Sequence, residues 1–142
     1  MTNFNGLKTW LKEHKITEVE CIVSDLTGIA RGKIMPASKF CDDAGIRLPE
    51  GVLVATVTGD YLDDYSMIDP AEIDVYLKPD PDAAHLLPWA TEPTAQIIHD
   101  CYDINGELVD LAPRTILRKV LKLYSDIGLT PIVAPEAEFY LT

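Results

Sequence analysis

Two glutamates near the end of the chain have the residue type and spacing that favour metal chemistry. Glu136 and Glu138 lie in the segment 135–139, which reads PEAEF. Alternating side chains predict a strand over 130–141, where residues two apart share a face at a separation of about 7 Å. Carboxylates in this arrangement suit Mg²⁺ or Mn²⁺, which prefer oxygen ligands. An edge strand with two solvated glutamates is the simpler interpretation, and spacing alone leaves both open.

A second group of carboxylates lies in the middle of the chain. Asp60, Asp63 and Asp64 fall within five residues of one another, in a segment rich in acids. Carboxylates in such a loop can meet a cation or an amine. The segment lacks the ligand spacing of an EF-hand. A solvated charged loop without a ligand is the simpler interpretation of this charge run.

Paired cations form the third candidate, in the segment 31–33, which reads RGK. Such a pair beside a glycine can meet a phosphate or a carboxylate, although these residues more often form the solvent face of a strand. His14, His85 and His99 are scattered without metal-ligand spacing, so we interpret them as structural or surface residues. The sequence contains neither a Gly-rich phosphate loop nor a nucleophile elbow.

The elements that must position these residues can be predicted from the periodicity of the apolar side chains. Pro113 and Gly128 mark the two ends of the clearest helix. The expected order is helix 3–14, a hairpin with strands near 19–23 and 29–35, a short helix 38–44, strands 52–57, 73–78 and 94–102, helix 113–127 and strand 130–141. This order favours the α+β class. Residues 1–110 form a unit with a small mixed sheet, and residues 111–142 open a second unit with a helix and a strand.

Composition restricts the classes of partner. The chain has 142 residues, is 47% hydrophobic and carries a formal net charge of -11. This charge disfavours nucleic acid and an anionic membrane surface as partners. Three widely spaced cysteines indicate free thiols in a reducing compartment. We find no signal-peptide pattern and no apolar run long enough for a membrane span, so we expect a cytoplasmic protein.

Four stretches of the sequence resemble motifs of the glutamine synthetase family. They occur in the family's order across the whole chain. They are 24–33 (SDLTGIARGK), similar to "D-x-x-G-x-x-R-G-K"; 78–81 with 87–89 (KPDP and LPW), similar to "PDP…PW"; 110–114 (DLAPR), similar to "D-P-R" with Ala112 in place of the usual Asp; and 134–141 (APEAEFYL), similar to "G-P-E-x-E-F-F-L".

This resemblance implies a β-grasp-like N-terminal domain over residues 1–110, followed by the linking helix and first strand of a catalytic α/β domain over 111–142. It also implies that Glu136 and Glu138 bind the divalent ions beside the phosphates of ATP. In the family, the N-terminal domain lends an Asp loop to the active site of the neighbouring subunit in a ring oligomer. Asp60 lies near the position of that loop, but the family's "D-G-S-S" is absent, so Asp63 or Asp64 can serve instead.

The resemblance further implies the reaction. In the family, ATP phosphorylates the γ-carboxylate of glutamate, and nitrogen attacks the resulting γ-glutamyl phosphate. The changed loop, together with the first two motifs, looks more like the branch that joins glutamate to an amine, such as γ-glutamylputrescine synthetase. The implied substrates are therefore glutamate and ammonia or a small amine, with ATP as co-substrate and Mg²⁺ or Mn²⁺ as cofactor.

Three hypotheses about the chain remain open from the sequence. The first is an N-terminal segment of such a ligase, inactive alone because the other metal ligands and most of the ATP pocket lie downstream in the family. The second is a stand-alone β-grasp module that binds partners or regulates the enzyme. The third is a self-contained metal-binding domain that uses Glu136, Glu138 and the acidic loop.

Overall fold

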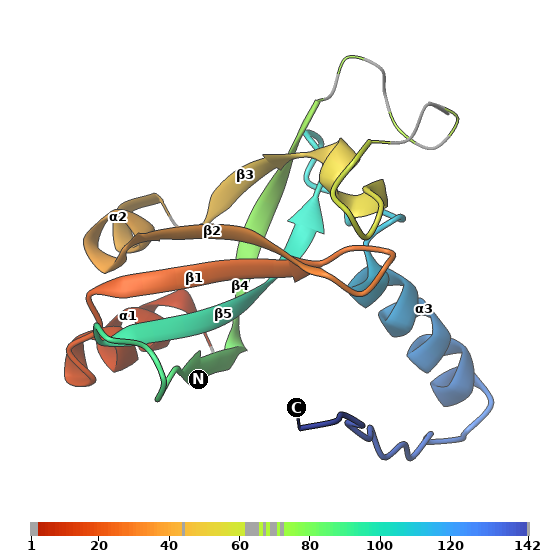
Figure 1. Cartoon of the computed structure of the whole chain (residues 1–142). Coiled ribbons are helices and arrows are strands. Elements are labelled where there is room, and N and C mark those ends of the chain that lie inside the picture. Colours follow the sequence, from red (N-terminus) through yellow and green to blue (C-terminus); the bar gives the residue numbers. More distant parts are fainter. Residues whose placement is uncertain are drawn as a thin grey trace.

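Five strands form one mixed sheet, in the order β2-β1-β5-β4-β3 (Figure 1). The structure, a computed structural model, describes residues 3–43, 45–61, 66, 68, 71 and 73–141. The elements are α1 (Phe4–Glu13), β1 (Glu18–Ser24), β2 (Ala30–Pro36), α2 (Ala37–Asp43), β3 (Ile46–Pro49), the 3-10 helix η1 (Glu50–Val54), β4 (Asp74–Leu86), β5 (Thr94–Tyr102) and α3 (Pro113–Asp126). The expected α+β class, with a mixed sheet and short helices, is confirmed.

The centre of the sheet is a parallel pair. β1 runs parallel to β5, and the β1–β2, β4–β5 and β3–β4 pairs are antiparallel. Along β1, Val19, Cys21 and Val23 are buried while the residues between them are partly exposed. This alternation follows from the two-residue period of a strand, and it directs every second side chain of β1 into the core.

Helices α1 and α2 supply the apolar side chains that cover the sheet in the first part of the core. Leu7 of α1 and Phe40 of α2 are fully buried in one cluster with Val19 of β1 and Ile97 of β5. α1 begins where the side chain of Asn3 accepts a hydrogen bond of 2.9 Å from the backbone N–H of Gly6. That bond satisfies one of the free N–H groups at the helix start.

A second core cluster forms around η1. Leu53 of η1 is fully buried and packs with residues that include Val75 of β4 and Cys101 of β5. Residues 52–57 were expected to form a strand because they are rich in β-branched side chains, and this expectation is wrong. They fold as part of a 3-10 helix and a following turn. Leu53, Val54 and Ala55 are nevertheless buried, so their burial does not require strand pairing.

β4 is interrupted by an irregularity in its pairing with β5. The register shifts between Pro79 and Ala84, over a stretch that also contains Pro81. Proline has no N–H to donate to a neighbouring strand, so prolines inside sheets occur at edges and bulges. The irregularity displaces Asp80 from regular strand pairing and leaves its carboxylate to contact α3.

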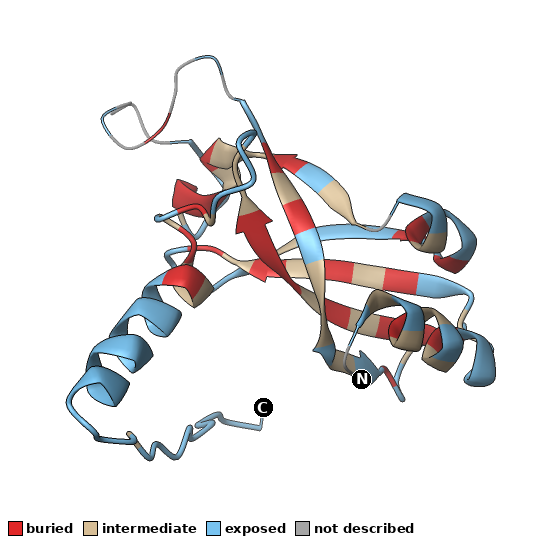
Figure 2. Cartoon of the chain, turned by 180° about the vertical axis from the view of Figure 1, so that it is seen from behind, coloured by how far each residue is buried: buried red, intermediate tan, exposed pale blue. Residues whose placement is uncertain are grey.

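α3 leaves the sheet with most of its surface exposed (Figure 2). Thr115 in its first turn is buried, whereas Leu117, Leu123 and Ile127 are 56–70% exposed. The expected strand over 130–141 does not form, and residues 129–141 lie outside any helix or strand. Among the described residues no strand pairs with this segment, and an unpaired strand is not stable. Within the described part of the chain, no helix is both long and apolar enough to cross a membrane.

Candidate functional site

Asp60 closes a tight turn that begins at Thr56. The backbone N–H of Thr56 donates to the Asp60 carbonyl at 2.9 Å, and the Asp60 N–H donates to Thr56 Oγ1 at 3.0 Å. The Thr58 hydroxyl donates to Asp60 Oδ2 at 2.6 Å, and the Gly59 N–H donates to the Thr56 carbonyl at 2.9 Å. The Asp60 side chain is exposed, so the turn holds a carboxylate in a defined orientation where a ligand can reach it.

An ion pair between the buried Asp25 and the partly exposed Arg31, both in the β1–β2 hairpin, supports this turn. Asp25 is 1% exposed, and its Oδ1 accepts from the Thr27 N–H, the Thr27 hydroxyl and the Ile29 N–H at 2.8–2.9 Å. Its Oδ2 accepts from Arg31 Nε at 2.7 Å. Arg31 Nη2 then donates to the Thr56 carbonyl at 2.8 Å. One guanidinium therefore connects the hairpin to the turn that carries Asp60.

The hydrogen bonds at Asp25 keep it ionised despite its burial. Burial alone would raise the pKa of this carboxyl, but the hydrogen bonds from Arg31, Thr27 and the Ile29 amide outweigh burial and hold the pKa below its usual value. The buried carboxylate and the guanidinium thus form a charged pair in which each partner satisfies the other.

Residues 31–33, the candidate for binding a phosphate or carboxylate ligand, make contacts with other residues of the chain instead. Arg31 binds a carboxylate as that interpretation allowed, but the carboxylate is Asp25 of the same hairpin. Lys33 Nζ donates to the Arg47 carbonyl at 3.0 Å, which connects β2 to β3. A Cβ at Gly32 would lie 1.9 Å from the Cys21 carbonyl oxygen, so this glycine allows the close approach of β1 and β2.

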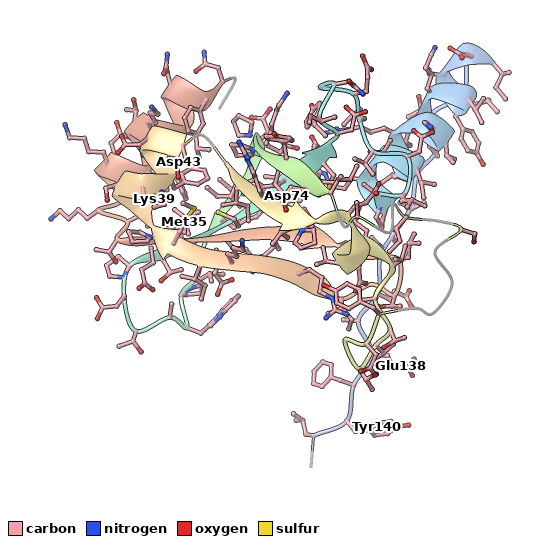
Figure 3. All side chains as sticks on the ribbon, turned by 90° about the horizontal axis from the view of Figure 1, so that it is seen from above. Met35, Lys39, Asp43, Asp74, Glu138 and Tyr140 are labelled. Atoms are coloured by element: carbon pink, nitrogen blue, oxygen red, sulfur yellow. The ribbon has the colours of Figure 1, made fainter. Side chains whose placement is uncertain are left out.

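Glu136 and Glu138 are exposed and lie on the segment that follows α3. Figure 3 shows Glu138 on a trace that extends away from the sheet. Figure 1 shows this segment below α3, well apart from the turn that carries Asp60. The described residues contain no group of three or more His, Cys, Asp or Glu side chains that could hold a metal ion. Asp63 and Asp64, the alternatives to Asp60, lie outside the described residues.

The start of α3 is fixed to the sheet by a cluster of four charges that sequence patterns did not reveal. Arg114 contacts Asp80 and donates from Nε to Asp100 Oδ1 at 3.0 Å. Arg118 Nη2 lies 2.7 Å from Asp100 Oδ2. Asp100 is 9% exposed. The cluster joins β4, β5 and α3 and sets the direction in which α3 leaves the sheet. The sequence places Asp80 in the motif "PDP" and Arg114 in the motif "APR". Neither motif indicates that these two residues form an ion pair.

The histidines fit their interpretation as structural or surface residues. His14 and His85 are exposed, and His99 is 1% exposed. His99 Nδ1 lies 2.8 Å from the Ile97 carbonyl, and its ring meets Phe40 edge-on at 6.1 Å between centroids.

Cys21, Cys41 and Cys101 are free thiols.

The homologues of this chain are members of the glutamine synthetase family. The motif resemblance seen in the sequence is therefore confirmed by whole-chain comparison. No protein-family model matches the chain.

Among the relatives are two ligases that act on glutamate and an amine. The chain is 29% identical over 143 residues to glutamate–isopropylamine ligase of Pseudomonas sp, a match that covers 95% of this chain and 30% of the relative. It is also 29% identical to γ-glutamylputrescine synthetase of Escherichia coli strain K12, over 95% of this chain and 29% of the relative. Glutamine synthetase of Staphylococcus aureus is 32% identical over 96% of this chain and 29% of the relative.

A solved structure has the same fold. The GmaS–ADP complex superposes with a TM-score of 0.68 at 26% identity, over 89% of this chain and 26% of that chain. The present chain thus spans about 30% of the length of the curated relatives it matches.

Proposed function

We propose that this chain supplies part of a ligase that uses ATP to join the γ-carboxylate of glutamate to ammonia or a small amine, by way of γ-glutamyl phosphate. The observation that carries the proposal is the similarity to glutamate–isopropylamine ligase over 95% of the chain. The division into a β-grasp-like unit of residues 1–110 and the opening of a catalytic unit at 111 is part of the same proposal.

A divalent cation, Mg²⁺ or Mn²⁺, belongs to this proposal, and Glu136 and Glu138 would hold it. Both side chains offer carboxylate oxygens, the donors that these ions prefer. Two carboxylates leave most positions of an octahedral ion free, so further ligands and water must complete the site. When bound, the ion would neutralise charge on the phosphoryl group that passes from ATP to glutamate.

Asp60 would supply the negative charge that attracts the nitrogen substrate. Ammonium and alkylamines are cations at neutral pH, and an exposed carboxylate held in a fixed turn suits them. In a ring homo-oligomer this carboxylate would act in the neighbouring subunit's active site, since the turn at 56–60 lies well apart from the segment 129–141 within one chain (Figure 1). We expect the ligase to work in the cytoplasm, which contains ATP and keeps free thiols such as Cys41 reduced.

The test is an assay of phosphate release by the whole protein. ATP, Mg²⁺ and glutamate would be supplied with ammonium, isopropylamine or putrescine in turn, and the γ-glutamyl product would be identified by mass spectrometry. We expect phosphate release that requires glutamate and one of the amines, and that stops when EDTA removes the divalent ion. The 142-residue chain alone is expected to release no glutamate-dependent phosphate.

Two results would count against the proposal. One is the absence of a γ-glutamyl product with every amine offered to a folded whole protein. The other is full activity in the presence of EDTA. Robust glutamate-dependent phosphate release by the 142-residue chain would instead contradict the expectation that this chain holds only part of the site.

A further inference from the structure

The turn that carries Asp60 depends on Thr56 as a shared hydrogen-bonding residue. The Thr56 carbonyl accepts from Gly59 within the turn and from Arg31 outside it. The Thr56 hydroxyl accepts from the Asp60 N–H at 3.0 Å and lies 2.9 Å from the Thr58 hydroxyl. Any displacement of Thr56 therefore moves the donors and acceptors that orient the Asp60 carboxylate.

Arg31 is the side chain that holds Thr56 in place from outside the turn. Its Nε is fixed by the buried Asp25, which lies six residues away in the sequence, and its Nη2 binds the Thr56 carbonyl. Its Nη1 lies within 3.7 Å of the position a Cβ on Gly59 would occupy. The planar guanidinium thus donates from two of its nitrogens, Nε and Nη2, in one fixed geometry that a lysine ammonium cannot reproduce.

A second connection keeps the hairpin and η1 together without Arg31. The Leu26 N–H donates to the Leu53 carbonyl at 2.9 Å, and Leu53 is fully buried in the second core cluster. Loss of the guanidinium should therefore release the turn at 56–60 while the hairpin stays docked. This separation makes the role of Arg31 testable apart from folding.

We propose that Asp25 and Arg31 are positioning residues: the ion pair fixes the Thr56–Asp60 turn and so fixes the orientation of the Asp60 carboxylate. The positioning itself follows from the contacts of the described residues. Its consequence for catalysis rests on the proposed function, in which Asp60 meets the amine. A pair that served stability alone would alter the unfolding of the chain without a selective effect on this turn or on one substrate.

The first test measures the turn directly. Amide exchange with solvent would be followed by NMR in the 142-residue chain and in its Arg31→Lys variant. We expect the Gly59 and Asp60 amides to exchange about tenfold faster in the variant, while the amides of β1 and β5 keep their rates. Unchanged exchange at Gly59 and Asp60 would overturn the proposal, and so would an equal acceleration at every amide, which indicates global destabilisation.

The second test measures substrate use by the whole protein. Arg31→Lys is expected to raise KM for the amine about tenfold, with KM for glutamate and ATP within about twofold. Arg47→Lys is the matched control, because Arg47 is exposed on β3 and lies over the ring of Tyr76 rather than against the turn. We expect the control to leave all three KM values unchanged. Equal rises of all three KM values in Arg31→Lys would overturn the catalytic consequence.

A double variant distinguishes this inference from the proposed function. If Arg31 acts through Asp60, adding Arg31→Lys to Asp60→Asn should change KM for the amine no further, whereas independent effects would multiply. Multiplied effects would overturn the positioning role. If Asp60→Asn alone leaves KM for the amine unchanged, the role of Asp60 in the proposed function fails, and amide exchange still decides whether Arg31 holds the turn.

Discussion

His99 places an imidazole inside the core, between the sheet and α2. Assigned as the donor to the Ile97 carbonyl, Nδ1 carries the proton, so Nε2 has only a lone pair and no hydrogen-bond partner among the described residues. Burial is the main cause that lowers the pKa of His99 to about 4, against the smaller opposing effects of the Ile97 backbone, the nearby Asp100 charge and the Ile22 backbone. The side chain is therefore neutral in the folded chain at neutral pH.

This depressed pKa predicts a pH-dependent loss of stability. Below pH 6.5, the ordinary histidine pKa, His99 is protonated in the unfolded chain. In the folded chain it stays neutral until the pH falls to about 4. The free energy of unfolding should fall between these values by on the order of 3 kcal/mol. Urea unfolding at a series of pH values should show this slope in the native chain and in His85→Leu, whose histidine is exposed. His99→Leu should lack it, and parallel curves for all three chains would refute the assignment.

Sequence patterns identified some residues of the site but not the contacts between them. Asp60 and the charged residues of the first hairpin could be singled out from their types and spacing. The bond between Arg31 and the Thr56 carbonyl could not, because it joins residues 25 apart in the sequence, and it depends on how the hairpin packs on η1. The pairing of Arg114 with Asp80 and Asp100 is missed for the same reason.

At the scale of elements, the periodicity of apolar residues predicted the amphipathic helices and the strands whose side chains alternate between buried and exposed. α1, α3, the first hairpin and β5 lie close to their expected ranges. β3 was not predicted, because its four residues end in Pro49 and are too few to show a period. The segment 130–141 has the alternation of a strand, but a strand forms only beside another strand, and the described chain offers it none.

The close contact of β1 and β2 at Gly32 gives a prediction about these elements. Alanine at Gly32 would bring its Cβ to 1.9 Å from the Cys21 carbonyl oxygen, so the two strands must separate. We expect a loss of about 3 kcal/mol or more in the free energy of unfolding, at the upper end for an overpacked site.

Gly106→Ala is the matched control for this substitution. Gly106 has a positive φ of 83° but no atom within 4 Å of the added Cβ, so only backbone strain of roughly 1–2 kcal/mol should appear. Thermal or urea unfolding of both variants measures the difference. Equal losses in the two variants would show that the contact at Gly32 relaxes without cost.

At the scale of the whole molecule, the chain divides into a packed sheet and an exposed C-terminal part. Phe139 and Tyr140 are 74% and 92% exposed, in a segment without helix or strand. Exposed irregular backbone is the preferred substrate of proteases. The 142-residue chain should therefore lose residues from this segment to chymotrypsin well before the sheet is cut, and mass spectrometry of timed samples measures the order of cleavage.

Trp89 provides an internal comparison for this digestion. It is 77% exposed, but it lies in the short connection between β4 and β5, where the Ala90 N–H donates to the Leu87 carbonyl and the Leu87 N–H donates to the Thr94 carbonyl. Cleavage after Trp89 should be slower than cleavage after Tyr140. The reverse order would mean that the segment 129–141 is protected in solution.

The parallel pairing of β1 with β5 has a consequence for the order in which the chain folds. The side chains of Glu20 and Gln96 bond across these two strands although they are 76 residues apart. During synthesis, β1 can pair with β2 as soon as the hairpin emerges, but the other edge of β1 has no partner until β5 has left the ribosome. Contacts of such long range slow folding and leave an unpaired strand edge exposed to other chains. The nascent chain is therefore most prone to aggregation after the β1–β2 hairpin has emerged from the ribosome and before β5 (Thr94–Tyr102) has emerged.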